Sequence, residues 1–210
     1  NIYSFFETVF LEEEEIDLND LNIIVYSNVP PLDTNLIEYL STLNGPKIIN
    51  SLRGLNKVRY KDYIEEIFPN GSEYIPNSFY ANNEFEAIDH IESNQHQKQW
   101  ILKPNMGSGG NDVILLNTNK PFWIKELTDY FDTQDDIIVV QEFIKEAGGA
   151  DLRALVVDGQ VVGAMKRQGK EGEFRSNLHR GGSAHIIKLS HDELKLAMNA
   201  SQALMLPVCG

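Results

Sequence analysis

Six of the chain's 18 lysine and arginine residues fall within the 28 residues from Arg153 to Arg180. The chain as a whole is acidic, with a formal net charge of −13, so solubility does not require this local excess of positive charge. Arginine side chains match the oxygens of phosphates and carboxylates, and the cluster therefore indicates a site for a polyanion. A solvated basic face that balances acidic neighbours is the alternative. Part of the cluster lies in EGEFRSNLHRGG, residues 171–182 (the basic loop), which follows neither a strand nor a helix period.

A second candidate is the segment KPNMGSGG, which begins at Lys103. Glycines let backbone N–H groups approach a phosphate closely, and a nearby ammonium group supplies the compensating charge. The segment lacks the Gly-Lys-Ser/Thr ending of a Walker loop and the glycine spacing of a Rossmann motif. A plain hairpin turn explains these glycines equally well.

A third candidate is VVQEFIKE, an apolar strand that ends in Gln141 and Glu142. Such a strand end can offer backbone groups to a purine edge, with apolar side chains against the ring. An ordinary strand with a polar exit is the alternative, and it is favoured when this segment is taken alone.

Regular elements are predicted on both sides of these candidates. Strands are expected over residues 99–104, 112–116 and 136–144, and helices over 84–92 and 122–131. Alternating residues on both sides of Asp158-Gly159 predict a hairpin with a type I′ turn.

The remaining segments indicate an α/β layer and a final helix. Residues 21–27 read as a strand, Asp33 as the N-cap of a helix, and residues 51–68 as a further helix. Ser190 and Glu193 predict a capping box at the start of the last helix.

Composition excludes several classes of protein. With 210 residues, 42% of them hydrophobic and 23% charged, the chain is expected to fold into a globular protein. Its acidity argues against nucleic acid or a membrane as a partner, and its single cysteine, Cys209, fits a cytoplasmic location. The chain begins at Asn1 rather than methionine and stops at Gly210 after an apolar run, so both ends are expected to be cut.

The segments ILKPNMGSGG and VVQEFIKEAGGADLRALVVDGQVVGAMKRQGKEGEFRSNLHRGGSA resemble the ATP-grasp ligases, and among them the RimK-type glutamate ligases most closely. The resemblance covers roughly residues 50–210, and FRSNLHRGG is its most specific part. It implies an α/β protein with an α+β ATP-grasp fold, whose nucleotide cleft lies between two α+β subdomains. The expected domains are 1–50 (remainder of an N-terminal α/β domain, truncated), 51–140 (first ATP-grasp subdomain with linker) and 141–210 (second subdomain, C-terminally incomplete).

The resemblance also implies an activity. ATP would phosphorylate a carboxylate, and an amine would displace phosphate from the acyl-phosphate to form an amide, with magnesium or manganese bridging the phosphates. Glutamate is the expected amine donor, and a peptide or protein C-terminus is the expected acceptor. A glutathione synthetase-like ligase and a non-catalytic ATP-binding module are the alternatives. The oligomeric state stays open, since a homo-oligomer is compatible with the family.

Residue roles follow from the same resemblance. The residues expected to bind ATP are Lys61, Lys103, Gly107, Ser108, Gly109, Gly110, Glu142, Phe143, Ile144, Asp151, Arg175, Ser176 and Asn177. Arg167, Arg175 and Asn177 are the expected catalytic residues. Arg153, His179 and Arg180 are expected to bind substrate.

Two departures from the family pattern stand out. Asn111-Asp112 replaces a further glycine before Val113, and an aspartate beside phosphates would repel them unless it points away. The family's metal-binding aspartate, glutamate and asparagine would fall beyond Gly210, so no metal ligands are assigned and this chain by itself is expected to be almost inactive.

Overall fold

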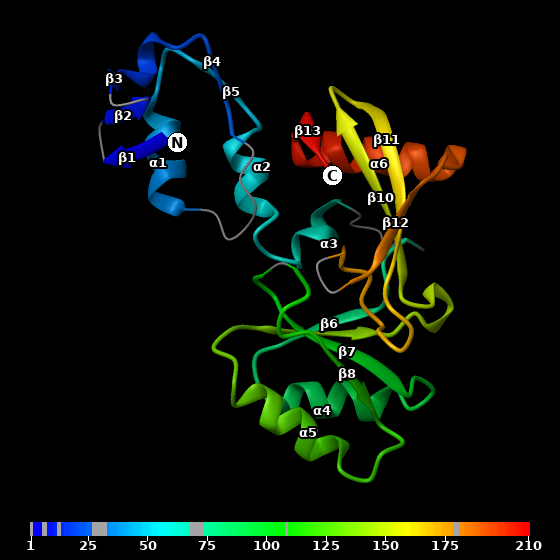
Figure 1. The fold of residues 1–210 in the computed structure, drawn as a ribbon. Coiled ribbons are helices and arrows are strands. Elements are labelled where there is room, and N and C mark those ends of the chain that lie inside the picture. Colours follow the sequence, from blue (N-terminus) through cyan, green and yellow to red (C-terminus); the bar gives the residue numbers. More distant parts are fainter. Residues whose placement is uncertain are drawn as a thin grey trace. The chain divides into compact units, whose positions relative to one another are not determined.

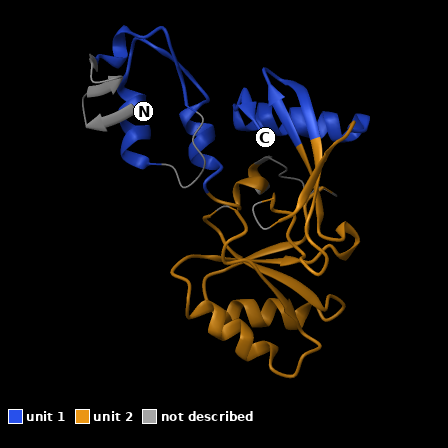
Figure 2. Cartoon of the chain, in the orientation of Figure 1, with its two compact units in different colours: residues 1–59, 154–164, 189–210 blue, residues 60–153, 165–188 orange. Residues whose placement is uncertain are grey.

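The computed structural model of the chain describes residues 2–5, 8–11, 14–26, 33–67, 74–107, 109–178 and 181–210. The chain divides into two compact units (Figure 2). Unit 1 comprises residues 1–59, 154–164 and 189–210, and unit 2 comprises residues 60–153 and 165–188. The domain boundaries expected at residues 50 and 140 stay predictions.

Unit 1 begins with a small antiparallel sheet and continues into an α/β layer. Strands β1 (Ile2–Phe5), β2 (Thr8–Leu11) and β3 (Glu14–Ile16) form the sheet, and a 3-10 turn, η1 (Leu18–Asp20), follows it. Strand β4 (Ile23–Val25) then pairs in parallel with β5 (Lys47–Ile49), and helix α1 (Thr34–Thr42) connects them. The Asp33 carboxylate accepts hydrogen bonds from the N–H groups of Asn35 and Leu36, so the predicted N-cap is confirmed.

Two helices pack closely against each other in the rest of unit 1. Helix α2 (Leu52–Lys57) approaches helix α6 (His191–Leu204) at Gly54, where a Cβ atom would lie 2.0 Å from the Leu204 carbonyl oxygen. The capping box of Ser190 and Glu193 is present, as predicted. Strand β13 (Val208–Cys209) follows, and its Val208 N–H donates to Asn50 Oδ1 at 2.9 Å.

The single helix predicted over residues 51–68 is wrong, because the chain leaves helical geometry between α2 and α3 (Tyr63–Ile67). Within this break the Lys61 N–H donates to the Asn105 carbonyl oxygen at 3.0 Å and to Asn105 Oδ1 at 2.9 Å. Tyr60 also forms a β-bridge with Met106. Partners more than 40 residues along the chain therefore replace the helical hydrogen bonds here.

The core of unit 2 is a four-stranded antiparallel sheet of order β6-β9-β7-β8. Its strands are β6 (Ser78–Ala81), β7 (Gln99–Pro104), β8 (Ile114–Asn117) and β9 (Ile138–Glu142). Helices α4 (Glu84–Ser93) and α5 (Trp123–Phe131) cover one face of this sheet (Figure 1). Trp100, Leu102 and Leu127 are fully buried between the sheet and the helices.

A long hairpin follows the 3-10 turn η2 (Lys145–Ala147). Strands β10 (Ala150–Val157) and β11 (Gln160–Gln168) meet at Asp158 and Gly159, whose φ angles of 48° and 72° fit the predicted type I′ turn. Strand β12 (Ser183–Ile186) pairs with β11, and β13 pairs with β10. No helix among the residues that the structure describes is long and apolar enough to cross a membrane.

Candidate nucleotide site

Lys103 lies near the end of β7, on the sheet face that points away from α4 and α5. Trp100 and Leu102 occupy the helix-covered face, and successive side chains of a strand alternate between faces. The Lys103 ammonium donates to Gln141 Oε1 at 2.9 Å, and Gln141 Nε2 donates in turn to Ser78 Oγ at 2.7 Å. Burial, with a smaller contribution from the positive charge of Lys61, lowers the pKa of Lys103 to about 8. The surroundings of Lys103 thus compensate its positive charge only in part, so its charged form is under-compensated.

Lys61 holds the chain just after β7. Its ammonium donates to the carbonyl oxygens of Pro104 at 2.6 Å, Asn105 at 3.1 Å and Gly107 at 3.3 Å. Burial lowers the pKa of Lys61, and the nearby Asp136 carboxylate opposes this shift. Two cationic side chains therefore lie at the start of the glycine-containing loop.

Residues 105–113 form that loop, which we call the glycine-rich loop. Asp136 accepts a hydrogen bond from the Met106 N–H at 2.8 Å, and the Tyr130 hydroxyl donates to the Asp112 carbonyl oxygen. Burial and the nearby Asp112 raise the pKa of Tyr130 well above its usual value. Both ends of the loop are thereby tied to the sheet-and-helix core.

Asp112 belongs to the Asn111-Asp112 pair, where the resemblance led us to expect a further glycine. Its φ angle is +53°, in the left-handed region where glycine is favoured and aspartate is tolerated better than most residues. The residue is exposed to solvent. The backbone at this position therefore has a conformation that glycine favours.

The end of β9 is fixed by contacts with its neighbours. Glu142 accepts a hydrogen bond from the Asn77 N–H through Oε1 at 3.0 Å, and the Phe143 N–H donates to the Gln99 carbonyl oxygen at 3.0 Å. Ile144 is 41% exposed. This stretch therefore combines ordered backbone with an accessible apolar side chain, as a binding edge for a purine would require.

Asp151, at the start of β10, joins the hairpin to the basic loop. Arg167 donates to both of its carboxylate oxygens, through Nε at 2.7 Å and through Nη2, and the Ser176 hydroxyl donates to Oδ2. Burial alone would raise the pKa of the Asp151 carboxyl. The hydrogen bonds from Arg167 and Ser176, with the charges of Arg167 and Arg153, outweigh burial and hold this pKa below its usual value.

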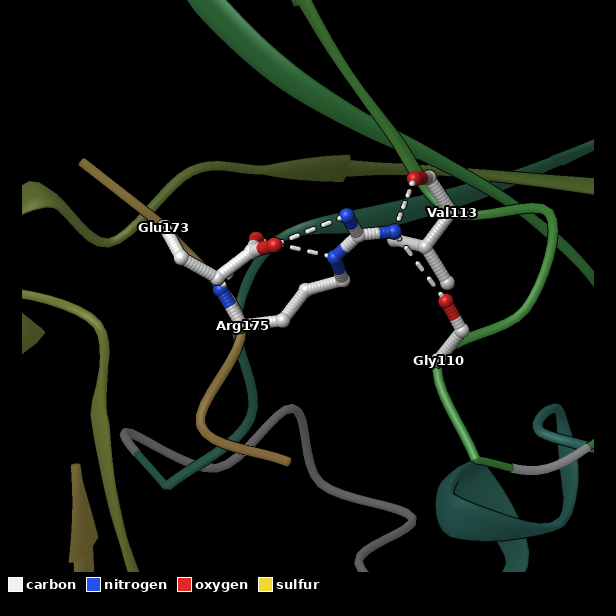
Figure 3. A network of polar contacts seen from close by, with 4 residues as sticks. All are labelled: Gly110, Val113, Glu173 and Arg175. Carbon is white, nitrogen blue, oxygen red and sulfur yellow. Dashed lines mark hydrogen bonds and ion pairs between the residues drawn. The ribbon is translucent and has the colours of Figure 1, made fainter. Parts of the chain in front are cut away.

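Arg175 joins the basic loop to the glycine-rich loop (Figure 3). Its Nη1 donates to the carbonyl oxygens of Gly110 at 3.3 Å and Val113 at 3.4 Å. Its Nε and Nη2 donate to Oε1 and Oε2 of Glu173, each at 2.9 Å. Phe174 lies between Glu173 and Arg175 in the sequence, and its ring meets that of Phe143 edge-on with centroids 6.3 Å apart. The basic loop therefore contacts the glycine-rich loop, the hairpin and the end of β9.

Asn177 lies against Gly110. A Cβ atom on Gly110 would stand 2.6 Å from Asn177 Oδ1, and the φ angle of Gly110 is +72°. The backbone conformation therefore favours glycine, and a larger residue would also have to displace the Asn177 side chain.

Unit 2 contains all of the predicted site residues that the structure describes. Arg153 is exposed and contributes positive charge toward Asp151. Ser108, His179 and Arg180 lie outside the described residues. The residues from Lys61 to Gly110 and those from Asp151 to Asn177 are linked through Arg175 and Asn177. Their individual roles toward ligands stay predictions.

Several residues of this network were missed by the sequence reasoning. Glu173 pairs with Arg175, Gln141 pairs with Lys103, and Asn105 is 3% exposed and accepts the N–H groups of Lys61 and Asp62. An acidic residue two positions before an arginine in a basic loop is a usable signal for Glu173. The partners of Lys103 and Lys61 come from other segments and leave no local signal.

The sequence of the chain is similar to those of known proteins. Residues 70–210 match the sequence profile of the RimK-like ATP-grasp domain. A probable alpha-L-glutamate ligase of Saccharophagus degradans is 46% identical over 136 residues, which cover 65% of this chain and 44% of that protein. A probable alpha-L-glutamate ligase of Teredinibacter turnerae is 40% identical over 166 residues, 79% of this chain and 54% of that protein. The chain thus spans about half the length of the curated relatives it matches.

Solved structures share the fold at low sequence identity. The D-cycloserine synthetase DcsG gives a TM-score of 0.69 at 12% identity. The match covers 92% of this chain and 69% of the synthetase chain. A RiPP-associated ATP-grasp ligase of Chryseobacterium gregarium, in complex with ADP and a leader and core peptide, gives a TM-score of 0.68 at 15% identity. The match covers 96% of this chain and 67% of the ligase chain. The ATP-grasp ligase PsnB, complexed with a phosphomimetic variant of its minimal precursor, Mg and ADP, gives 0.56 at 18% identity, covering 83% and 50%. The ATP-grasp fold expected from the sequence is confirmed, and the chain belongs to the RimK-like ATP-grasp family.

Proposed function

We propose that the protein is an ATP-dependent carboxylate–amine ligase that adds glutamate to the C-terminus of a peptide or protein. The names of its relatives support glutamate as the amine donor. The complexes of two structural neighbours with precursor peptides support a peptide acceptor.

The observation that carries this proposal is the under-compensated ammonium group of Lys103, which lies near that of Lys61. Among the described residues Lys103 donates to the neutral Gln141 side chain, and burial and the second ammonium group hold its pKa near 8. A triphosphate placed beside the two lysines would supply the missing negative charge and favour their protonated forms. The donor chemistry of the site therefore fits the phosphates of ATP.

The nucleoside end of ATP would extend toward the end of β9. We assign the adenine to the edge formed by Glu142, Phe143 and Ile144, and the ribose hydroxyls to Asp151. The Asp151 carboxylate already accepts from Arg167 and Ser176. Its two oxygens can accept about four hydrogen bonds in all, which leaves capacity for a ribose hydroxyl.

The proposed reaction has two steps. An oxygen of the acceptor carboxylate attacks the γ-phosphorus of ATP, the bond to ADP breaks, and an acyl-phosphate forms. The deprotonated amine of glutamate then attacks the acyl carbon, the C–O bond to phosphate breaks, and an amide, inorganic phosphate and a proton result. Positive charge around the transferring phosphoryl group lowers its barrier, and we assign this role to Lys61, Lys103, Arg175 and Asn177.

Arg153, Arg167, His179 and Arg180 are assigned to the carboxylates of the substrates. Magnesium would supply further charge compensation on the phosphates. Among the described residues no group of three or more His, Cys, Asp or Glu side chains is placed to hold a metal ion.

The activity is tested with the full-length protein, by measuring ADP release with glutamate, glycine or no amine in the presence of a peptide acceptor. Glutamate-dependent ADP release supports the proposal, and glycine-dependent release supports a glutathione synthetase-like ligase instead. ATP binding without amine-dependent release supports a non-catalytic module. An acceptor labelled with ¹⁸O in its carboxylate tests the acyl-phosphate, because one labelled oxygen must appear in the released phosphate.

A further inference from the structure

Glu173 is the acidic residue closest to Arg175 within the basic loop, and the two side chains form a two-pronged ion pair. Glu173 also accepts the backbone N–H of Arg175 through Oε1 at 3.1 Å. The side chains are only 23% and 22% exposed. Such a pair has a defined geometry, because the arginine fork and the carboxylate are both planar.

The pair determines which part of Arg175 meets the glycine-rich loop. A guanidinium group has five N–H donors, and Glu173 takes one from Nε and one from Nη2. This leaves Nη1 directed at the carbonyl oxygens of Gly110 and Val113 (Figure 3). Without Glu173 the side chain could rotate away from this position.

The contact with Gly110 also sets the direction of a backbone N–H group. A trans peptide is planar, so the Gly110 carbonyl and the N–H of the next residue, Asn111, point to opposite sides. By holding the carbonyl, Arg175 orients this N–H. Glycine at position 110 has a φ angle of +72° and great conformational freedom, so the orientation depends on such an external contact.

We propose that Glu173 is a positioning residue, which acts through Arg175 to hold the glycine-rich loop in the conformation that binds the phosphates of ATP. The inference deepens the proposed function and rests on its nucleotide site. Glu173 has no contact with ligand in this account, and its effect passes through Arg175 and Gly110.

The test uses Glu173→Gln, which keeps the size of the side chain and removes its charge. Glu171→Gln is the matched control, because Glu171 is exposed and lies two residues away in the same loop. Hydrogen exchange of the ligand-free protein is measured first. Glu173→Gln should speed exchange at residues 109–114 about 10- to 100-fold, as expected for loss of a charge-assisted hydrogen bond, and Glu171→Gln should leave it unchanged.

Isothermal titration with ATP and magnesium is the second measurement. Glu173→Gln should raise the Kd by a similar factor, and Glu173→Asp, which restores the charge on a shorter side chain, should recover part of the loss. Faster exchange throughout unit 2 rather than in the glycine-rich loop would assign Glu173 a general structural role and overturn the proposal. Equal or tighter ATP binding by Glu173→Gln would also overturn it. Failure of the wild-type protein to bind ATP would refute the proposed function itself, while the exchange result would still report on the contact.

Discussion

The side-chain oxygen of Asn177 lies 2.6 Å from the position that a Cβ atom on Gly110 would occupy. The basic loop and the glycine-rich loop are therefore in contact at a place where a larger residue would have to displace the Asn177 side chain. Gly110→Ala should weaken ATP binding and destabilise the protein, through this clash and through a backbone strain of about 1–2 kcal/mol. Denaturant unfolding and ATP titration measure the two effects.

Gly159→Ala is the matched control for that change. Gly159 has the same φ angle of +72°, but nothing lies within 4 Å of its Cβ position. It should show the backbone strain alone and bind ATP normally. Equal effects of the two substitutions on ATP binding would contradict the proposed contact.

Arg175→Ala should spare the fold and lower turnover by about 10²–10³, the usual effect of removing one donor that stabilises transition-state charge. The measurement is steady-state ADP release by the full-length protein with glutamate and acceptor. Lys120→Ala is the control, because Lys120 is an exposed cation that pairs loosely with Glu126 at 3.8 Å. An unchanged rate for Arg175→Ala would remove Arg175 from the site.

Lys103 predicts a pH dependence of ATP binding. Its pKa lies near 8 in the folded protein, against an ordinary value of 10.5, so it loses its charge as the pH rises through 8. Phosphates favour the charged form, and ATP affinity should fall between pH 7 and pH 9.5. Titration near pH 8 in two buffers of different ionisation enthalpy should also show proton uptake on binding.

The lowered pKa of Lys103 makes folding stability change with pH in the opposite direction to ATP affinity. Between pH 8 and pH 10.5 the unfolded chain binds more protons at Lys103 than the folded chain, so the contribution of this residue to the free energy of unfolding rises with pH there.

Lys103→Arg stays charged throughout this range. An ATP affinity with the same pH dependence in both proteins would contradict the role of Lys103.

The Asp151–Arg167 pair predicts a modest, pH-dependent effect on stability. The pKa of Asp151 is lowered in the folded protein, so its contribution is present above the ordinary pKa of an aspartate and is lost as the pH falls through the folded value. The Asp151 side chain is 38% exposed, and solvent screening limits the effect of Asp151→Asn to about 0.5–1 kcal/mol at neutral pH. Urea unfolding at pH 7 and in acid checks this, and a difference that persists in acid would exclude the ion pair as its cause.

Elements with local signals could be predicted from the sequence. Asp33, the Ser190–Glu193 box and the Asp158-Gly159 turn each depend on neighbouring residues, and the structure confirms all three. The break between α2 and α3 could not be predicted, because residues 58–62 contain neither glycine nor proline. It depends on Asn105, 44 residues from Lys61.

The site divides in the same way. Residue types identified the basic loop and the segment after Lys103 as candidates, because their charged residues and glycines do not follow a helix or strand period. The contact between them depends on Arg175 reaching Gly110, 65 residues away, and the Glu173 pair depends on a loop conformation. The spacing of Glu173 and Arg175 is a local signal for their pair, but no local pattern encodes the contact with Gly110.

The measurement that tests the central claim most directly is titration of ATP and magnesium into the wild-type protein, Lys103→Met and Lys98→Met. Lys98 is exposed and precedes the strand that carries Lys103, so it controls for the loss of one positive charge. The wild-type protein and Lys98→Met should bind ATP with similar affinity, and Lys103→Met should bind it at least tenfold more weakly, as the loss of a charge-assisted contact to phosphate requires. Equal affinities of Lys103→Met and Lys98→Met for ATP would contradict the claim that the lysine pair is the phosphate site.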